Sequence, residues 1–149
     1  MPSATRTNET LLASGLAEVA LGALSGWPFS LAVSNPERAR QLGIRSTHRL
    51  RQWHLDLVAL GSLQALAATA VPELPRKVAW PLMVAGWTNA NAFAPLIARP
   101  ELKDHPAYKA AAVASFATAS WGFTGLAAVA ARRRLESGRR RPLGRRGRR

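Results

Sequence analysis

Residues 111–131 read AAVASFATASWGFTGLAAVAA, and only Ser, Thr and Gly interrupt their apolar side chains. An α-helix needs roughly 20 apolar residues to cross a hydrocarbon core about 30 Å thick. A helix of a soluble four-helix bundle would instead need a polar stripe that faces water, and this stretch has none. We therefore predict a transmembrane helix over residues 108–131.

Three other segments have the same character. We expect helices over residues 11–33, 44–71 and 78–98, so the predicted fold is all-α, an integral membrane four-helix bundle over residues 11–131. The first segment has an apolar run of 23 residues. Because this run is longer than the roughly 7–15 residues of a cleaved signal peptide, we expect it to remain as a membrane helix. The second segment begins with polar turns before its apolar part.

The charged residues are concentrated in the connections and the tails. The 149-residue chain has a formal charge of +13, and ten of its 21 basic residues lie at or after Arg132. We expect residues 1–10 to form a short N-terminal tail and residues 132–149 an Arg-rich tail, disordered because proline and glycine interrupt it. A basic run beside an apolar helix favours membrane lipid, by roughly 1 kcal/mol per basic residue. No base-reading motif accompanies it, so we expect no nucleic-acid partner.

The distribution of basic residues also predicts a topology. Four spans place both termini on one side of the membrane. The N-terminus, the second connection and the tail together hold 13 basic residues, and the other two connections hold eight. By the positive-inside rule, we expect a multi-pass protein of the cell inner membrane with cytoplasmic N- and C-termini.

Few residue types are available for chemistry. Without cysteine the chain has no disulfide, thiolate metal site or iron–sulfur cluster, and no serine triad or phosphate loop is apparent. Its histidines are His48, His54 and His105. On one helix, His48 and His54 would be about 9 Å and about 120° apart, so they cannot ligate one metal ion from the same helix. Either could hold a haem iron as a single axial ligand, or both are polar residues at the headgroup level.

Two carboxylates lie in or near the apolar spans. An ionisable side chain at the centre of a membrane helix costs on the order of 2.5–3.5 kcal/mol and needs a partner. We expect Asp56 to balance an arginine or to orient an imidazole from another helix. Glu18 either has a function or forms a structural hydrogen bond with an amide of a neighbouring helix, the candidates being Gln64, Asn89 and Asn91.

A short motif suggests a family. The third helix carries Gly86-Trp87-Thr88-Asn89, whose Trp lies 39 residues after His48. Four short helices, a histidine at the head of the second and this motif at this interval resemble the styrene oxide isomerases, in which the axial histidine precedes Gly-Trp-Ser-Asn. The hydroxylaminobenzene mutases are also similar, with counterparts of Asn35-Pro36-Glu37 and Leu42-Gly43-Ile44 before their histidine. The resemblance covers about residues 11–130.

The resemblance implies a cofactor, a reaction and site residues. It implies ferric haem b between the subunits of a homotrimer, with His48 as the metal ligand and Trp87 beside the cofactor. The iron would act as a Lewis acid on the oxygen of an apolar epoxide, and a hydride shift would give an aldehyde. The implied catalytic positions are His54, Asn89 and Phe93. Two of them differ from the family, which has Asn in place of His54 and Tyr in place of Phe93.

Three other functions fit the same pattern. An arylhydroxylamine mutase would share the architecture and form aminophenols. A non-catalytic haem-binding protein would follow if His54 filled the sixth iron position. A membrane scaffold without a cofactor would depend on the arginine tail alone.

Overall fold

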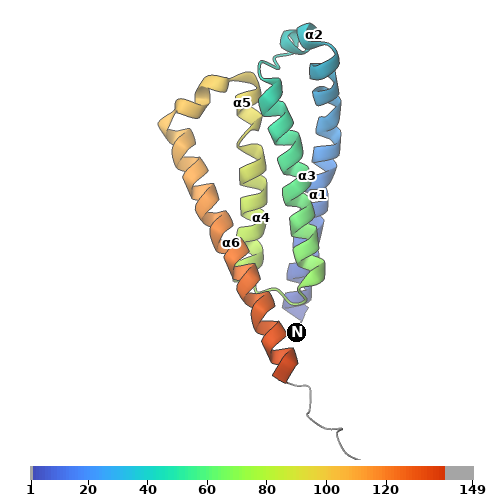
Figure 1. The fold of residues 1–149 in the computed structure, drawn as a ribbon, viewed down its shortest axis with the longest axis vertical. Helices are drawn as coiled ribbons and strands as arrows, with labels where there is room; N and C mark the ends of the chain where they lie inside the picture. The colour runs from blue at the N-terminus through green and yellow to red at the C-terminus, as the bar shows by residue number, and fades with distance from the viewer. Residues whose placement is uncertain (1, 140–149) are drawn as a thin grey trace, which may run out of the picture.

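The computed structural model describes residues 2–139. Its helices are α1 (Pro2–Ser34), α2 (Pro36–Gln41), α3 (Thr47–Ala70), α4 (Arg76–Asn91), α5 (Ala94–Ala98) and α6 (Pro106–Arg139), with a 3-10 helix, η1 (Pro100–Asp104), before α6. No strand occurs among these residues, so the prediction of an all-α fold is confirmed. The four long helices run side by side, and the start of α1 lies at the same end as the end of α6 (Figure 1).

Three of the long helices, α1, α3 and α4, pack against one another, and the fourth, α6, packs mainly on α4. α1 packs along α3, α3 packs on α4, and α4 also contacts α1. α6 packs mainly on α4 and diverges from it toward α5, which leaves a wedge between the two helices (Figure 1). The core is therefore built by α1, α3 and α4.

The helix ends differ from the predicted bounds in ways that local chemistry explains. α1 begins at Pro2, so residues 2–10 belong to this helix and do not form a separate tail. α3 begins at Thr47 because the Ser46 hydroxyl accepts a hydrogen bond from a backbone N–H in its first turn. α6 continues to Arg139, so the expectation of a tail from residue 132 is wrong for residues 132–139, and residues 140–149 lie outside the described residues.

The predicted helix over residues 78–98 is broken into α4 and α5. Pro95 lies in the first turn of α5, and its ring would clash with the carbonyl of Asn91 in a continuous helix. The break leaves the carbonyl of Ala92 without a helical partner, and the Tyr108 hydroxyl of α6 donates to it at 3.0 Å.

Pro81, inside α4, also leaves a backbone carbonyl without its helical partner, and a side chain of α6 again donates to it. Pro81 has no N–H to donate to the carbonyl of Lys77, four residues earlier. The indole N–H of Trp121 in α6 donates to that carbonyl at 3.2 Å. Side chains of α6 therefore satisfy carbonyls that two interruptions in α4 leave open.

α1 and α3 cross at very short range. A Cβ added to Gly61 would lie 2.6 Å from the carbonyl oxygen of Gly15, so neither position has room for a side chain. The Gly-x-x-x-Gly pattern formed by Gly22 and Gly26 in α1 is typical of close helix packing. Gly22 fulfils this, since a Cβ there would lie 2.7 Å from Val58 Cγ2, whereas Gly26 approaches only His54, at 3.6 Å.

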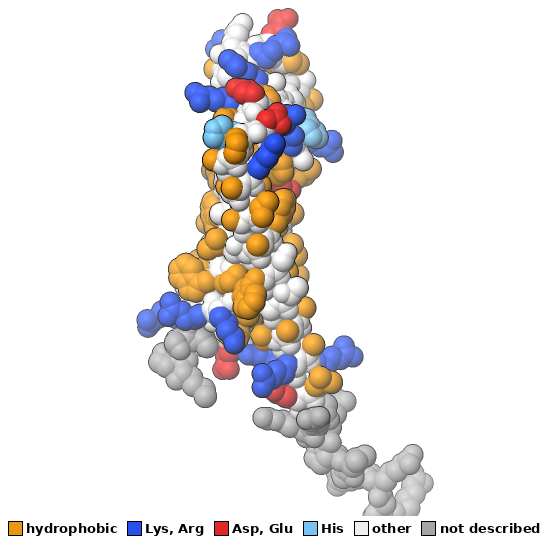
Figure 2. Space-filling view, turned by 90° about the vertical axis from the view of Figure 1, so that its left-hand side faces the viewer, with side chains coloured by type: hydrophobic (Ala, Val, Ile, Leu, Met, Phe, Trp, Pro, Cys, Tyr) orange, Lys and Arg blue, Asp and Glu red, His pale blue; other side chains and the backbone are white. Residues whose placement is uncertain are grey.

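Much of the outer surface is apolar. α1 and α6 are long and apolar enough to cross a membrane. Yet only 22% of the most apolar stretch of α1, and 11% of that of α6, is buried within the chain. Trp27 is 79% exposed and Trp121 64% exposed. Figure 2 shows hydrophobic side chains along the middle of the molecule, with most charged side chains at its two ends.

The glycine crossing leads to a stability prediction. Gly61→Val should destabilise the protein by about 1–3 kcal/mol, because the new side chain would meet the backbone of α1. Ser62→Val, one position further along and exposed, is the matched control and should have little effect. Thermal unfolding of the purified protein in detergent measures both. Equal stability of the two variants would show that the helices do not cross at this position.

Candidate functional site

A chain of hydrogen bonds joins three helices in the interior. The indole N–H of Trp87 in α4 donates to the Ser14 hydroxyl of α1 at 3.0 Å. That hydroxyl donates to the Gln64 side-chain oxygen of α3, also at 3.0 Å. The Gln64 amide nitrogen in turn donates to Glu18 Oε2 of α1. Polar side chains from α1, α3 and α4 are thus connected within an otherwise apolar core.

Glu18 is the end point of this chain. Its side chain is completely buried, and its second oxygen, Oε1, has no hydrogen-bond partner among the described residues. A Cβ on Gly86 of α4 would overlap the Gln64 amide, so glycine is needed at this position. Of the three partners considered for Glu18 from the sequence, the structure places Gln64 against it.

The two asparagines of α4 have different partners. The Asn89 amide donates to the carbonyl of Ala85 in its own helix at 2.9 Å and joins no other helix. The Asn91 oxygen accepts from the indole N–H of Trp53 in α3 at 3.1 Å. The expected link between helices is therefore made by Asn91.

His54 is held in one orientation by α1. Its Nδ1 lies 2.9 Å from the carbonyl oxygen of Gly22 and 3.1 Å from the Ser25 hydroxyl, and its ring stacks on Phe29 with centroids 5.7 Å apart. A carbonyl oxygen can only accept, so Nδ1 carries the proton of the neutral ring, and Nε2 keeps its lone pair. Metal-binding histidines are commonly fixed in this way.

His48 lies in the first turns of α3. It is exposed, and its ring forms no hydrogen bond within residues 2–139. Phe93, which the resemblance places in the same site, lies beneath Arg49, whose guanidinium carbon is 5.6 Å from the centre of the ring. This contact brings the break between α4 and α5 close to the start of α3.

No hydrogen bond or ring contact joins any two of the five predicted site residues in the part of the chain that the structure describes. Trp87 faces Ser14 of α1, whereas Phe93 lies in the break beyond the end of α4, against Arg49 of α3. His54 is turned toward α1, and His48 is turned outward. Among the described residues no three His, Asp or Glu side chains come together, so the candidate metal ligands are single imidazoles.

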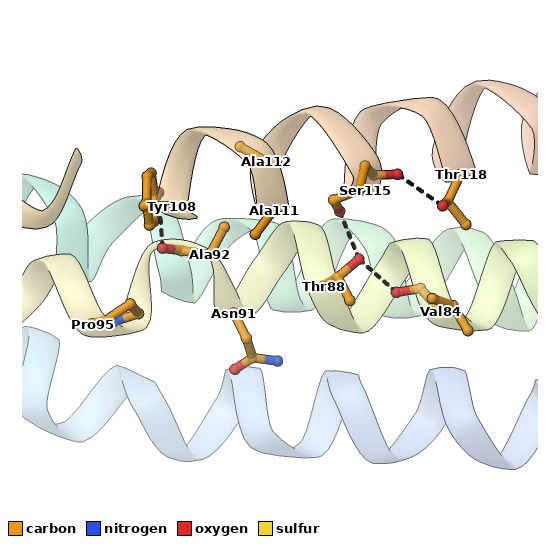
Figure 3. Close-up of a pocket in the computed structure, with 11 residues that line it drawn as sticks. Val84, Thr88, Asn91, Ala92, Pro95, Tyr108, Ala111, Ala112, Ser115 and Thr118 are labelled. Atoms are coloured by element: carbon orange, nitrogen blue, oxygen red, sulfur yellow. Dashed lines mark hydrogen bonds between the residues drawn. The ribbon is translucent and has the colours of Figure 1, made fainter. Parts of the chain in front are cut away.

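A cavity of about 480 Å³ lies in the wedge between α4 and α6. Figure 3 shows its polar contacts, a 2.6 Å hydrogen bond between the Thr88 and Ser115 hydroxyls and the bond from Tyr108 to Ala92. Its α6 wall consists largely of small residues, Ala111, Ala112, Ala114 and Ser115. This cavity was not predicted from the sequence, although the run of small residues marks its α6 wall. No histidine lines it.

No protein-family model matches this chain, and no characterised protein or solved structure does either. The resemblance to the styrene oxide isomerases therefore stays a hypothesis. It depends on the motif at Gly86–Asn89 and its interval from His48.

The interior hydrogen bonds lead to a coupling prediction. Gln64→Leu should destabilise the protein by about 1–3 kcal/mol, because it leaves the buried Glu18 without its donor. Glu18→Leu combined with Gln64→Leu should recover much of this loss, since the buried carboxyl is then removed and only the Ser14 hydroxyl loses a partner. Unfolding in detergent, with Gln41→Leu on exposed α2 as control, measures the coupling. Strictly additive effects would show that the two side chains act independently.

Proposed function

We propose that this chain is a membrane protein that crosses the bilayer four times, with α1, α3, the α4–α5 pair and α6 as its spans. α1 and α6 have the length and apolarity for this role. α3 exposes Leu55, Leu63 and Leu66 on its outer surface, where water would be unfavourable. α4 has 16 residues, about 24 Å of helix, and α5 extends it toward the other side of the bilayer.

Two alternatives fit these features less well. An apolar helix in the core of a soluble protein would be mostly buried, but only 11% of the most apolar stretch of α6 is buried by the rest of the chain. A cleaved signal sequence would contribute nothing to the mature fold. α1 instead supplies Ser14 and Glu18 to the interior and packs along α3.

Labelling tests this topology, because the chain has no cysteine of its own. In single-cysteine variants, Glu37→Cys before α3 and Asp104→Cys before α6 should react with a membrane-impermeant maleimide in intact spheroplasts. Glu73→Cys, in the connection between α3 and α4, should react only after permeabilisation. Equal labelling at all three positions would contradict four spans, and labelling at Glu73 alone would reverse the orientation.

The activity that the sequence pattern favours is a haem b-dependent isomerase that converts an apolar epoxide to an aldehyde. The observation that carries this proposal is His48, an exposed imidazole without a partner among the described residues, 39 residues before Trp87. One such imidazole is sufficient to hold a haem iron from one side. His48 therefore fits the cofactor, and its outward position agrees with a site completed by a neighbouring copy, as in a homotrimer.

The chemistry divides between cofactor and protein. When bound, ferric haem b supplies a Lewis acid for the epoxide oxygen. His48 would hold the cofactor, and an apolar pocket at the haem would exclude water, which favours rearrangement over hydrolysis to a diol. Phe93 cannot donate a hydrogen bond, so Asn89, whose side-chain nitrogen has a second hydrogen, is the proposed donor at this site.

One observation favours a second candidate. Because Nδ1 of His54 is held by the Gly22 carbonyl, its Nε2 can act as a ligand. If a neighbouring copy placed this nitrogen on the iron bound by His48, His48 and His54 would hold the haem together and leave no place for a substrate. The protein would then bind haem without isomerase activity.

Spectroscopy of the detergent-purified protein separates these functions. Protein from haem-replete cells should show a Soret band that His48→Ala removes. His105→Ala, which changes a histidine outside the proposed site, should leave the band unchanged. The isomerase predicts a spectrum that responds to added epoxide, and aldehyde as the product. A low-spin spectrum that becomes high-spin in His54→Ala and does not respond to epoxide supports the second candidate, whereas colourless wild-type protein contradicts both.

A further inference from the structure

Asn8 joins the start of α1 to the connection between α3 and α4. Its side-chain nitrogen donates to the carbonyl oxygens of Ala68, at 2.7 Å, and Val71, at 2.9 Å. Its side-chain oxygen accepts from the backbone N–H of Leu74 at 2.9 Å. One amide therefore satisfies three backbone groups at the end of α3 and fixes α1 against the connection that leads into α4.

This attachment brings two arginines to the same cleft. Arg6 lies two residues before Asn8, and Arg76 lies two residues after Leu74. Both line a cleft of about 240 Å³ between α1 and α4, together with Trp80 and three further residues, Thr7, Thr10 and Met83. Neither arginine forms an ion pair within residues 2–139.

The cleft combines two kinds of surface. Its rim carries two guanidinium groups, which bind phosphate oxygens well because each presents several N–H donors in one plane. Its floor is apolar, formed by Met83 and by Trp80, which is itself 48% exposed. No carboxylate lines the cleft, and neither Glu9 nor Glu73 is paired with its arginines.

We propose that this cleft binds the phosphate of an anionic phospholipid, with Arg6 and Arg76 on the headgroup and the start of an acyl chain along Trp80. Tryptophan and arginine are the residues expected where a membrane helix meets the headgroups. Free phosphate would use the arginines but would gain nothing from the apolar floor. The proposal rests on the four-span assignment, and it does not depend on haem.

Lipid binding to the full-length protein in detergent tests this site. Delipidated protein is titrated with phosphatidylglycerol, phosphatidylcholine or inorganic phosphate, and bound molecules are counted by native mass spectrometry. We expect one phosphatidylglycerol to bind more tightly than the rest and more tightly than phosphatidylcholine. Arg6→Gln combined with Arg76→Gln should weaken this first site by about tenfold or more.

The controls separate a site from a general effect of charge. Arg38→Gln with Arg40→Gln removes the same charge at the other end of the molecule and should leave the first site intact. Arg6→Lys with Arg76→Lys keeps the charge and should retain most of the binding, which also checks that the positions tolerate change. Equal losses in the two glutamine variants, or inorganic phosphate binding as tightly as the lipid, would overturn the proposal. The cysteine labelling tests the membrane assignment separately.

Discussion

The hydrogen bond between Gln64 and Glu18 is the interaction on which the packing of the helices depends. A buried carboxyl without a partner costs several kcal/mol in apolar surroundings, so α1 must place its Glu18 face against a donor. Gln64 of α3 is that donor. The pair can form because Gly15 and Gly61 let the two backbones approach closely and because Gly86 leaves room on α4. The hydrogen bond between Gln64 and Glu18 and the close approach at the glycines thus favour the same arrangement of α1, α3 and α4.

The sequence predicted the number and position of the long helices because each needs only a local apolar run. It did not predict their ends, which depend on capping side chains and on proline. Ser46 decides where α3 begins and Pro95 where α4 ends, and both effects involve only neighbouring residues. The extension of α1 to Pro2 differs in origin. Asn8 on α1 is tied to the end of α3 and to the loop after it, through contacts between residues 60 to 66 positions apart.

The candidate site was less predictable for a related reason. The interval between His48 and Trp87 is a distance along the chain, and it does not determine which way either side chain faces. Trp87 is turned into the interior by Ser14, a residue that no motif marked. The partner of Glu18 was within reach of sequence reasoning, since buried amides are few. The choice of Gln64 over the asparagines required knowing which helices are neighbours.

The peripheral position of α6 has a consequence for biogenesis. The chain of hydrogen bonds from Trp87 to Glu18 joins α1, α3 and α4 through contacts that involve no residue of α6. While the ribosome is still completing α6, the preceding helices can already associate as a unit, because none of these interior bonds waits for a later residue. α6 then docks from the side, where Tyr108 and Trp121 meet carbonyls of α4 and its C-terminal break. Assembly can thus follow the order in which the chain emerges from the ribosome.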